Sequence, residues 1–250
     1  MAFGMSPFPL QFGSRGGGVA APALPTISNL VAHWDFASAD NLTLRADGEL
    51  QYIEAAADLS GVGNTVSEAV AESQALWIPG AKNGRGVMRH NGAGNGLKRA
   101  AFVTDPLAQP ILILSALKFP DNNRCFLTCN DASSNTRRFV MGNHSTAVRV
   151  AQVVGGTLDV PVIDKYAGSW VYRIDIINAT TRKVIMPGGD ATLTPTTGSM
   201  YGACVGPNGS NFATNPSDAD VGEIAIWKHS PSSDEITSLI NYAKAKWAIS

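Results

Sequence analysis

Short apolar segments separated by turn residues are the feature of this sequence that most limits its fold. In the segment WVYRIDII at 170–177, large apolar side chains occupy every second position. A period of two is expected for a strand that places one face on a core and the other toward water. We count roughly ten to fourteen segments of this strand type, with turn signals between them. The sequence therefore predicts an all-β protein built as a β-sandwich.

Individual segments refine this prediction. LVAHWDF at 30–36 predicts a first strand, and ILILSALKF at 111–119 is apolar on both faces, as expected for a central strand covered on each side. The tripeptide ADG at 46–48 predicts a tight turn before the strand ELQYIEA, and the segment 187–190, PGGD, predicts another hairpin turn. The 25 glycines and 14 prolines of the chain fit such a turn-rich β protein.

One helix is predicted, at 232–247. Ser232 followed by Glu235 forms a capping box, in which each side chain satisfies a backbone N–H of the first turn. The apolar residues that follow are spaced by three and four and form one stripe along the helix. Lys244 and Lys246 fall in the last turns, where positive charge interacts favourably with the helix dipole.

Charge and composition exclude several classes of function. A net charge of −1 gives no general electrostatic attraction to nucleic acid or to an acidic membrane. No apolar run reaches the roughly 20 residues of a membrane span. The three cysteines, Cys125, Cys129 and Cys204, fit neither a disulfide framework nor a zinc ribbon, and they indicate assembly in a reducing compartment.

The segment 1–28 differs from the rest of the chain. It is rich in proline and glycine, which oppose both helices and interior strands. Pro7 and Pro9 interrupt what would be the apolar region of a secretory signal. An apolar arm of this kind becomes ordered most readily on the surface of a partner. We therefore predict an extended anchoring arm at 1–28 and a sandwich domain at 29–250, with a disordered leader as the alternative. The predicted anchoring residues are Phe3, Phe8, Leu10, Phe12 and Arg15.

The remainder of the chain, from about Leu30 to Ile249, resembles a known family. The end, GEIAIWKHSPSSDEITSLINYAKAKW, and the earlier turn DLSGVGN at 58–64 resemble laminin-G-like domains of the kind found in many phage virion proteins. The resemblance implies a concanavalin-A-like jelly roll of two antiparallel sheets with one C-terminal helix. It also implies a structural role in a virion, as a tail fibre, spike or decoration protein.

Catalytic patterns are missing from the sequence. Sandwich glucan hydrolases carry E-x-D-x-x-E on one strand, which places two carboxylates about 5 Å apart. No such string occurs, and Glu223 has no second acid two or four positions away. His144 and Ser145 are neighbours, but adjacent strand residues point to opposite faces and do not form a dyad. We therefore expect no enzymatic activity.

Sugar binding stays open at this point, because the chain has aromatic residues and asparagines that could form a lectin-type site. Trp170 and Trp227 are further aromatic candidates, although tryptophans on alternating strands usually belong to the core and Asn-Gly pairs usually form turns. The candidate glycan-binding residues are Trp77, Asn91, Asn95, Asn143, Asn208 and Asn211. No cofactor or metal is expected; the acidic loops at 38–41 and 216–220 leave calcium as an alternative.

Two functions remain. The first is a non-enzymatic component of a phage or phage-like particle, assembled in the host cytoplasm and attached to other virion proteins through the arm. Such parts are often cyclic homo-oligomers, and we expect a trimer that contacts host polysaccharide. The second is a free, lectin-like carbohydrate-binding module outside any virion.

Overall fold

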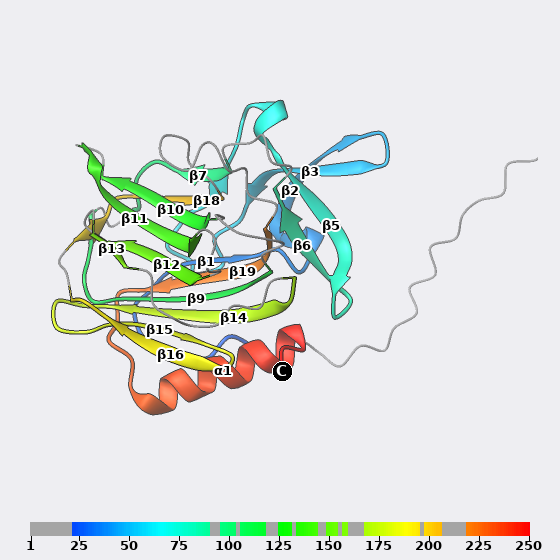
Figure 1. Cartoon of the computed structure of the whole chain (residues 1–250). Helices are drawn as coiled ribbons and strands as arrows, with labels where there is room; N and C mark the ends of the chain where they lie inside the picture. Colours follow the sequence, from blue (N-terminus) through cyan, green and yellow to red (C-terminus); the bar gives the residue numbers. More distant parts are fainter. Residues whose placement is uncertain are drawn as a thin grey trace, which may run out of the picture.

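The strands of the protein lie in stacked layers. The computed structural model describes residues 22–90, 96–103, 106–118, 125–131, 134–144, 149–154, 157–159, 168–195, 198–206 and 219–250. In Figure 1 the strands form layers, and the helix α1 runs along the outside of one of them. All strand pairs within these ranges are antiparallel.

The first layer is centred on β19, the last strand of the chain. One edge of β19 pairs with β9, which pairs in turn with β14, and β15 and β16 continue the layer. The other edge of β19 is shared by β6 and β1. The strands of this layer are β1 (Leu30–Asp35), β6 (Arg85–Arg89), β9 (Ile111–Lys118), β14 (Trp170–Ile177), β15 (Arg182–Met186), β16 (Gly189–Leu193) and β19 (Asp220–Trp227).

The second layer lies against the first and is continuous with it through hairpins. β6 pairs with β5 (Ala75–Lys82), which pairs with β3 (Leu50–Ala56), and β3 pairs with both β2 (Leu42–Asp47) and β4 (Val66–Ser67). From β4 the order continues through β7 (Leu97–Arg99), β18 (Ala203–Val205), β10 (Cys125–Asp131), β11 (Ser134–His144), β12 (Arg149–Val154) and β13 (Thr157–Asp159). A separate pair is formed by β8 (Leu107–Ala108) and β17 (Ser199–Met200).

Two hydrophobic cores explain the sequence pattern of β9. Ile113 and Leu117 point into an inner core between the layers, which also contains Trp34 and Phe126. The alternate residues of β9 lie in a helix-side core between the first layer and α1, together with Trp227 and Trp247. β9 is therefore the central, doubly covered strand that its sequence predicts. These observations confirm the predicted all-β jelly-roll sandwich with one C-terminal helix.

The helix α1 (Ser233–Trp247) begins at the predicted cap. The Ser232 side chain accepts a hydrogen bond from the Glu235 backbone N–H, and the Glu235 carboxylate accepts one from the Ser232 backbone N–H. The buried residues of the helix include Leu239, Tyr242 and Trp247. In the described part of the chain, no helix has the length and apolar character needed to cross a bilayer.

The last residues of the predicted arm pack on the sandwich. Ile27 is buried in the helix-side core, and Leu24 packs against that core. The predicted contact residues Phe3, Phe8, Leu10, Phe12 and Arg15 lie outside the described residues. The predicted boundary between arm and domain at residue 28 stays a prediction. Leu24 and Ile27 belong to the part of the segment 1–28 that packs on the sandwich domain.

The loop after β3 is fixed by one carboxylate. Asp58 accepts hydrogen bonds from the backbone N–H groups of His33, Ser60, Gly63 and Asn64 and from the Ser60 hydroxyl. Burial alone would raise the pKa of Asp58, but these donors outweigh burial and lower the pKa. The DLSGVGN motif is therefore a structural turn that joins β1 to the loop.

A buried histidine gives the fold a pH dependence. His90 is 2% exposed, its Nε2 lies 3.1 Å from the Val205 carbonyl oxygen, and Gly206 packs against the ring. Burial lowers the pKa of His90 to about 4, so the folded protein holds the ring neutral where the unfolded chain binds a proton. Stability is therefore lost as the pH falls below the ordinary pKa of 6.5.

We expect the free energy of unfolding to fall by about 2 kcal/mol between pH 7 and pH 5 on account of His90. Urea unfolding at both pH values measures this change. The variant His90→Gln should show a smaller pH dependence, because it removes the titrating group. An unchanged slope in this variant would assign the acid sensitivity to other groups.

Candidate functional site

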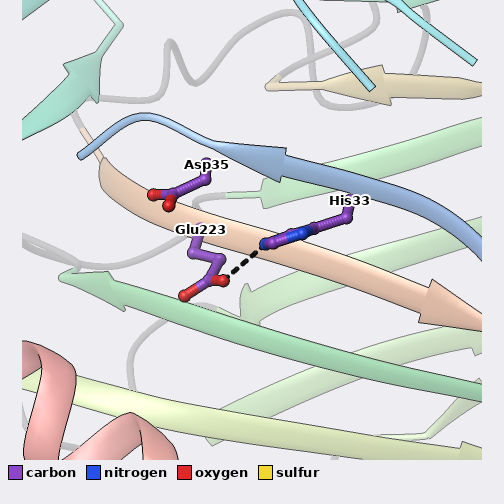
Figure 2. Close-up of side chains that lie close together, drawn as sticks. All are labelled: His33, Asp35 and Glu223. Carbon is purple, nitrogen blue, oxygen red and sulfur yellow. Dashed lines mark hydrogen bonds and ion pairs between the residues drawn. The ribbon is translucent and has the colours of Figure 1, made fainter. Parts of the chain in front are cut away.

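A buried cluster of charged and polar side chains joins β1, β19 and α1. We call it the ionic cluster, and it comprises His33, Asp35, Glu223, Tyr242, Lys246 and Trp247. Asp35 pairs with Glu223 in the register of β1 and β19, and His33 lies two residues before Asp35 on the same face of β1. Figure 2 shows the side chains of His33, Asp35 and Glu223 close together on these two strands.

Glu223 is the centre of the cluster. Its Oε1 accepts hydrogen bonds from Tyr242 Oη and His33 Nε2, each at 2.6 Å. Its Oε2 accepts from Trp247 Nε1 at 3.1 Å and lies 3.0 Å from Lys246 Nζ. Burial opposes ionisation of Glu223, but donation from His33 and the positive charge of Lys246 outweigh burial and lower its pKa to about 2. Glu223 therefore stays ionised near neutral pH, so its resting carboxylate can accept a proton.

Three side chains of the cluster are of the types that bind metal ions and lie close enough together to do so. One potential ligand atom from each of His33, Asp35 and Glu223 lies within 4.8 Å of the others. The Lys246 ammonium, however, lies 2.8 Å from Asp35 Oδ2 and 3.0 Å from Glu223 Oε2. The Lys246 ammonium thus already contacts both carboxylates, and the cluster links α1 to the sheet. We assign it a structural role.

An open site lies elsewhere, beside the hairpin of β2 and β3. A surface pocket of about 240 Å³ is lined by Arg45, Asp47, Tyr52, Ala71 and Glu72. Arg45 and Tyr52 are directly paired across the hairpin, so both side chains point to the same face. The short 3₁₀ helix η2 (Ala71–Ser73) supplies the other wall. A second 3₁₀ turn, η1 (Ala39–Asn41), precedes β2.

The guanidinium group of Arg45 is held in place in this surface pocket. Its carbon lies 4.7 Å from the centre of the Tyr52 ring, in cation–π contact. Its Nε donates to Gln74 Oε1 at 2.9 Å, and Gln74 is buried and donates in turn to the Glu68 carbonyl oxygen. Arg45 Nη1 is 3.7 Å from Asp47 Oδ2, too long for a direct hydrogen bond. Arg45 Nη2 donates a long hydrogen bond of 3.5 Å to the Ala71 carbonyl oxygen, so the N–H groups of Nη1 remain available to a ligand.

The tryptophans predicted from the sequence as sugar-binding candidates belong to the structure of the domain. Trp77 packs on the inner core and donates from Nε1 to the Phe36 carbonyl oxygen at 3.0 Å. Trp170 stacks on Trp247 with ring centres 5.7 Å apart, and Trp227 is fully buried. None of these three rings lines the surface pocket.

The asparagine candidates are not tested by the structure. Asn143 belongs to β11, but its side chain is not among those described. Asn91, Asn95, Asn208 and Asn211 lie outside the described residues. The pocket residues Arg45 and Tyr52 were missed by sequence reasoning, although the ADG turn gives the hairpin register that pairs them.

Comparison with known proteins identifies the fold. No protein-family model and no curated protein matches the sequence. Among solved structures, domain 4 of AbnA, a GH43 extracellular arabinanase from Geobacillus stearothermophilus in complex with arabinotriose, is similar with a TM-score of 0.58 and 14% identity. That alignment covers 85% of this chain and 98% of the other.

Two further similar structures are longer than this chain. A mutant GH54 α-L-arabinofuranosidase aligns with a TM-score of 0.63 and 15% identity over 87% of this chain and 63% of its own. The Trypanosoma rangeli sialidase in complex with sialic acid aligns with a TM-score of 0.51 and 12% identity over 89% of this chain and 34% of its own. The chain thus spans less than two thirds of either enzyme. At these identities the likeness shows a shared β-sandwich fold.

Proposed function

We propose that the protein is a non-catalytic β-sandwich that binds a polysaccharide, and that the surface pocket holds one sugar unit. The observation that carries this proposal is the fixed position of Arg45 over Tyr52 beside the carboxylates of Asp47 and Glu72. Sugar sites combine an apolar ring with a few oriented donors and acceptors in this way. Domain 4 of the arabinanase, solved with arabinotriose, supports the proposal as an example of a similar fold that holds an oligosaccharide.

The chemistry of the pocket matches a sugar with free hydroxyl groups. The carboxylates of Asp47 and Glu72 accept hydrogen bonds from hydroxyls, and the free N–H groups of Arg45 donate to hydroxyl or ring oxygens. The formal charge of the three side chains is negative, which favours a neutral sugar over a uronic or sialic acid. A volume of about 240 Å³ limits the pocket to a single unit of the chain.

The described residues favour binding without catalysis. Glycoside hydrolysis needs two carboxylates that reach opposite sides of the scissile bond. One described carboxylate pair, Asp35 and Glu223, is bound by Lys246, and Glu223 is 1% exposed. Neither group can approach a polysaccharide, so we propose that the protein retains the sugar without cleaving it.

Replacing Tyr52 with alanine should weaken glycan binding at least about tenfold, which corresponds to ~1.4 kcal/mol. The variant removes the ring of the pocket and leaves Arg45 without its cation–π partner. Binding is measured by calorimetry, beginning with arabinotriose and extending to a glycan array. Tyr201→Ala is the control, because Tyr201 does not line the pocket. Equal binding by Tyr52→Ala and wild type, or no glycan bound by the wild type, contradicts the proposal.

We further propose that this module belongs to a phage or phage-like particle and is attached to it through the segment 1–28. The support is the resemblance of the sequence to virion domains and the apolar, proline-rich composition of this segment. Since Leu24 and Ile27 pack on the sandwich, the informative truncation removes residues 1–21. The truncated protein should fold and bind glycan normally but fail to enter particles.

Size-exclusion chromatography with light scattering separates this proposal from the alternative, a free lectin-like module. A virion component of this kind is expected to form a cyclic homo-oligomer, with a trimer as the specific expectation. A monomer that enters particles neither with nor without residues 1–21 would favour the free module, whereas equal incorporation of both forms would contradict anchoring through this segment.

A further inference from the structure

We propose that Lys246 and Asp35 become joined by an intramolecular amide (isopeptide) bond, formed within the ionic cluster with Glu223 as the proton carrier. The bond would link β1 covalently to the last turn of α1. This inference is independent of the proposed glycan-binding function, because it concerns a covalent cross-link inside the domain and involves no residue of the surface pocket.

The reacting groups are already in contact. Lys246 Nζ lies 2.8 Å from Asp35 Oδ2, and Glu223 Oε2 lies 3.0 Å from the same Nζ. The register of β1 and β19 fixes the two carboxylates, and the packing of α1 fixes the amine. Holding an amine and a carboxyl group in this way replaces an encounter in solution by an effectively unimolecular step.

The reacting groups are shielded from water. The side chains of Lys246, Asp35 and Glu223 are 4%, 15% and 1% exposed. The ammonium also lies 5.4 Å from the centre of the Tyr242 ring and 5.5 Å from that of Trp247. Exclusion of water opposes the reverse reaction, hydrolysis of the amide.

The second oxygen of Asp35 has a donor of its own. The Ala37 backbone N–H donates to Asp35 Oδ1 at 3.0 Å. When Nζ attacks the carboxyl carbon, negative charge develops on an oxygen of the tetrahedral intermediate. A fixed backbone N–H stabilises such charge, as in an oxyanion hole. Oδ1 therefore becomes the retained carbonyl oxygen, and Oδ2 becomes the leaving oxygen.

The step balances without any other reactant. The ammonium of Lys246 first gives one proton to Asp35 Oδ2, and the neutral Nζ attacks the carboxyl carbon of Asp35. Glu223 Oε2 takes a second proton from the nitrogen and delivers it to the leaving oxygen. The C–N bond forms, the C–Oδ2 bond breaks, and one water molecule leaves. Glu223 ends as it began, and nothing is oxidised or reduced.

Mass spectrometry of the full-length protein tests the proposal. The intact mass should be lower than that of the open chain by one water molecule, and a protease digest should contain a joined peptide with Asp35 and Lys246. The variant Lys246→Arg should have the mass of the open chain and give no joined peptide. The exposed control Lys244→Arg should still be lighter than its open chain by one water molecule. Recovery of Asp35 and Lys246 only in separate, unmodified peptides of the wild type would overturn the proposal.

Two further variants test the roles of the groups. Asp35→Asn keeps the geometry but must release ammonia, so a joined product should have the same mass as the joined wild type. Glu223→Gln should lower the joined fraction at least tenfold, with circular dichroism used to confirm folding. A folded Glu223→Gln protein that is joined as completely as the wild type would contradict the role of Glu223.

Discussion

Replacement of Lys246 by methionine is expected to lower the free energy of unfolding by about 3–5 kcal/mol, because it leaves buried carboxylates without their cation. The Lys246 side chain is 4% exposed and contacts both Asp35 and Glu223. Methionine preserves most of the packing volume but supplies no positive charge. Chemical denaturation followed by tryptophan fluorescence measures the change.

Lys244→Met is the matched control for this prediction. Lys244 lies in the same last turns of α1 but is exposed, so its replacement should cost no more than about 1 kcal/mol through the helix dipole. In the double variant Lys246→Met/Glu223→Gln, part of the uncompensated negative charge is removed. The decrease in the free energy of unfolding of the double variant should therefore be smaller than the sum of the decreases in the two single variants. Additive losses would show that Lys246 does not act through Glu223.

Replacement of Trp247 by alanine should also cost about 3–5 kcal/mol, because it opens a cavity between α1 and the first layer. The Trp247 ring is fully buried, stacks on Trp170 and donates from Nε1 to Glu223. It also packs directly on Gly222, where a Cβ atom would lie 2.6 Å from a ring carbon. The variant removes apolar burial and a hydrogen bond to a buried carboxylate together. Thermal and denaturant unfolding both measure the loss.

Trp170→Ala is the comparison for Trp247→Ala. The two rings stack with an angle of 2° between their planes, but Trp170 is only partly buried. We therefore expect a clearly smaller loss from Trp170→Ala than from Trp247→Ala. Equal losses would mean that the stacked pair, and not the burial of Trp247, carries the stability of this region.

The sequence predicts the fold because the signals for it are local. The capping box at Ser232 and Glu235 and the two-faced apolar run of β9 each act within a few residues, and the structure confirms both. The alternation at 170–177 predicts the strand β14 correctly but not its solvent face, because Arg173 and Asp175 are buried and pair with each other. The ADG turn also predicts its hairpin, in which Gly48 has a φ of 61° that favours glycine.

The ionic cluster could not be predicted in the same way. His33 and Glu223 are 190 positions apart, and only the pairing of β1 with β19 brings them together. Sequence reasoning looked for a second acid on the strand of Glu223, whereas the structure supplies Asp35 from the neighbouring strand. Lys246 belongs to the predicted helix, but nothing local to α1 shows that its side chain turns inward to the sheet.

The surface pocket was missed for a different reason. Lectin sites are usually rich in tryptophan and asparagine, but the described tryptophans of this protein lie in the hydrophobic cores or pack against them. The pairing of Arg45 with Tyr52 could have been predicted from the sequence, because an antiparallel hairpin with a known turn defines which residues face each other. The contribution of η2 to the pocket could not be predicted from the sequence, since it depends on the path of the chain between β4 and β5.

The place of β19 at the centre of the first layer has a consequence for biosynthesis. β1 is made first, but the strand that pairs with it ends at Trp227, and α1 follows later still. A nascent chain on the ribosome therefore carries β1 and β9 with apolar faces uncovered until β19 and α1 have been synthesised. The first layer can therefore form only after β19 has been made, and chaperones that bind extended apolar segments should associate with the chain until then.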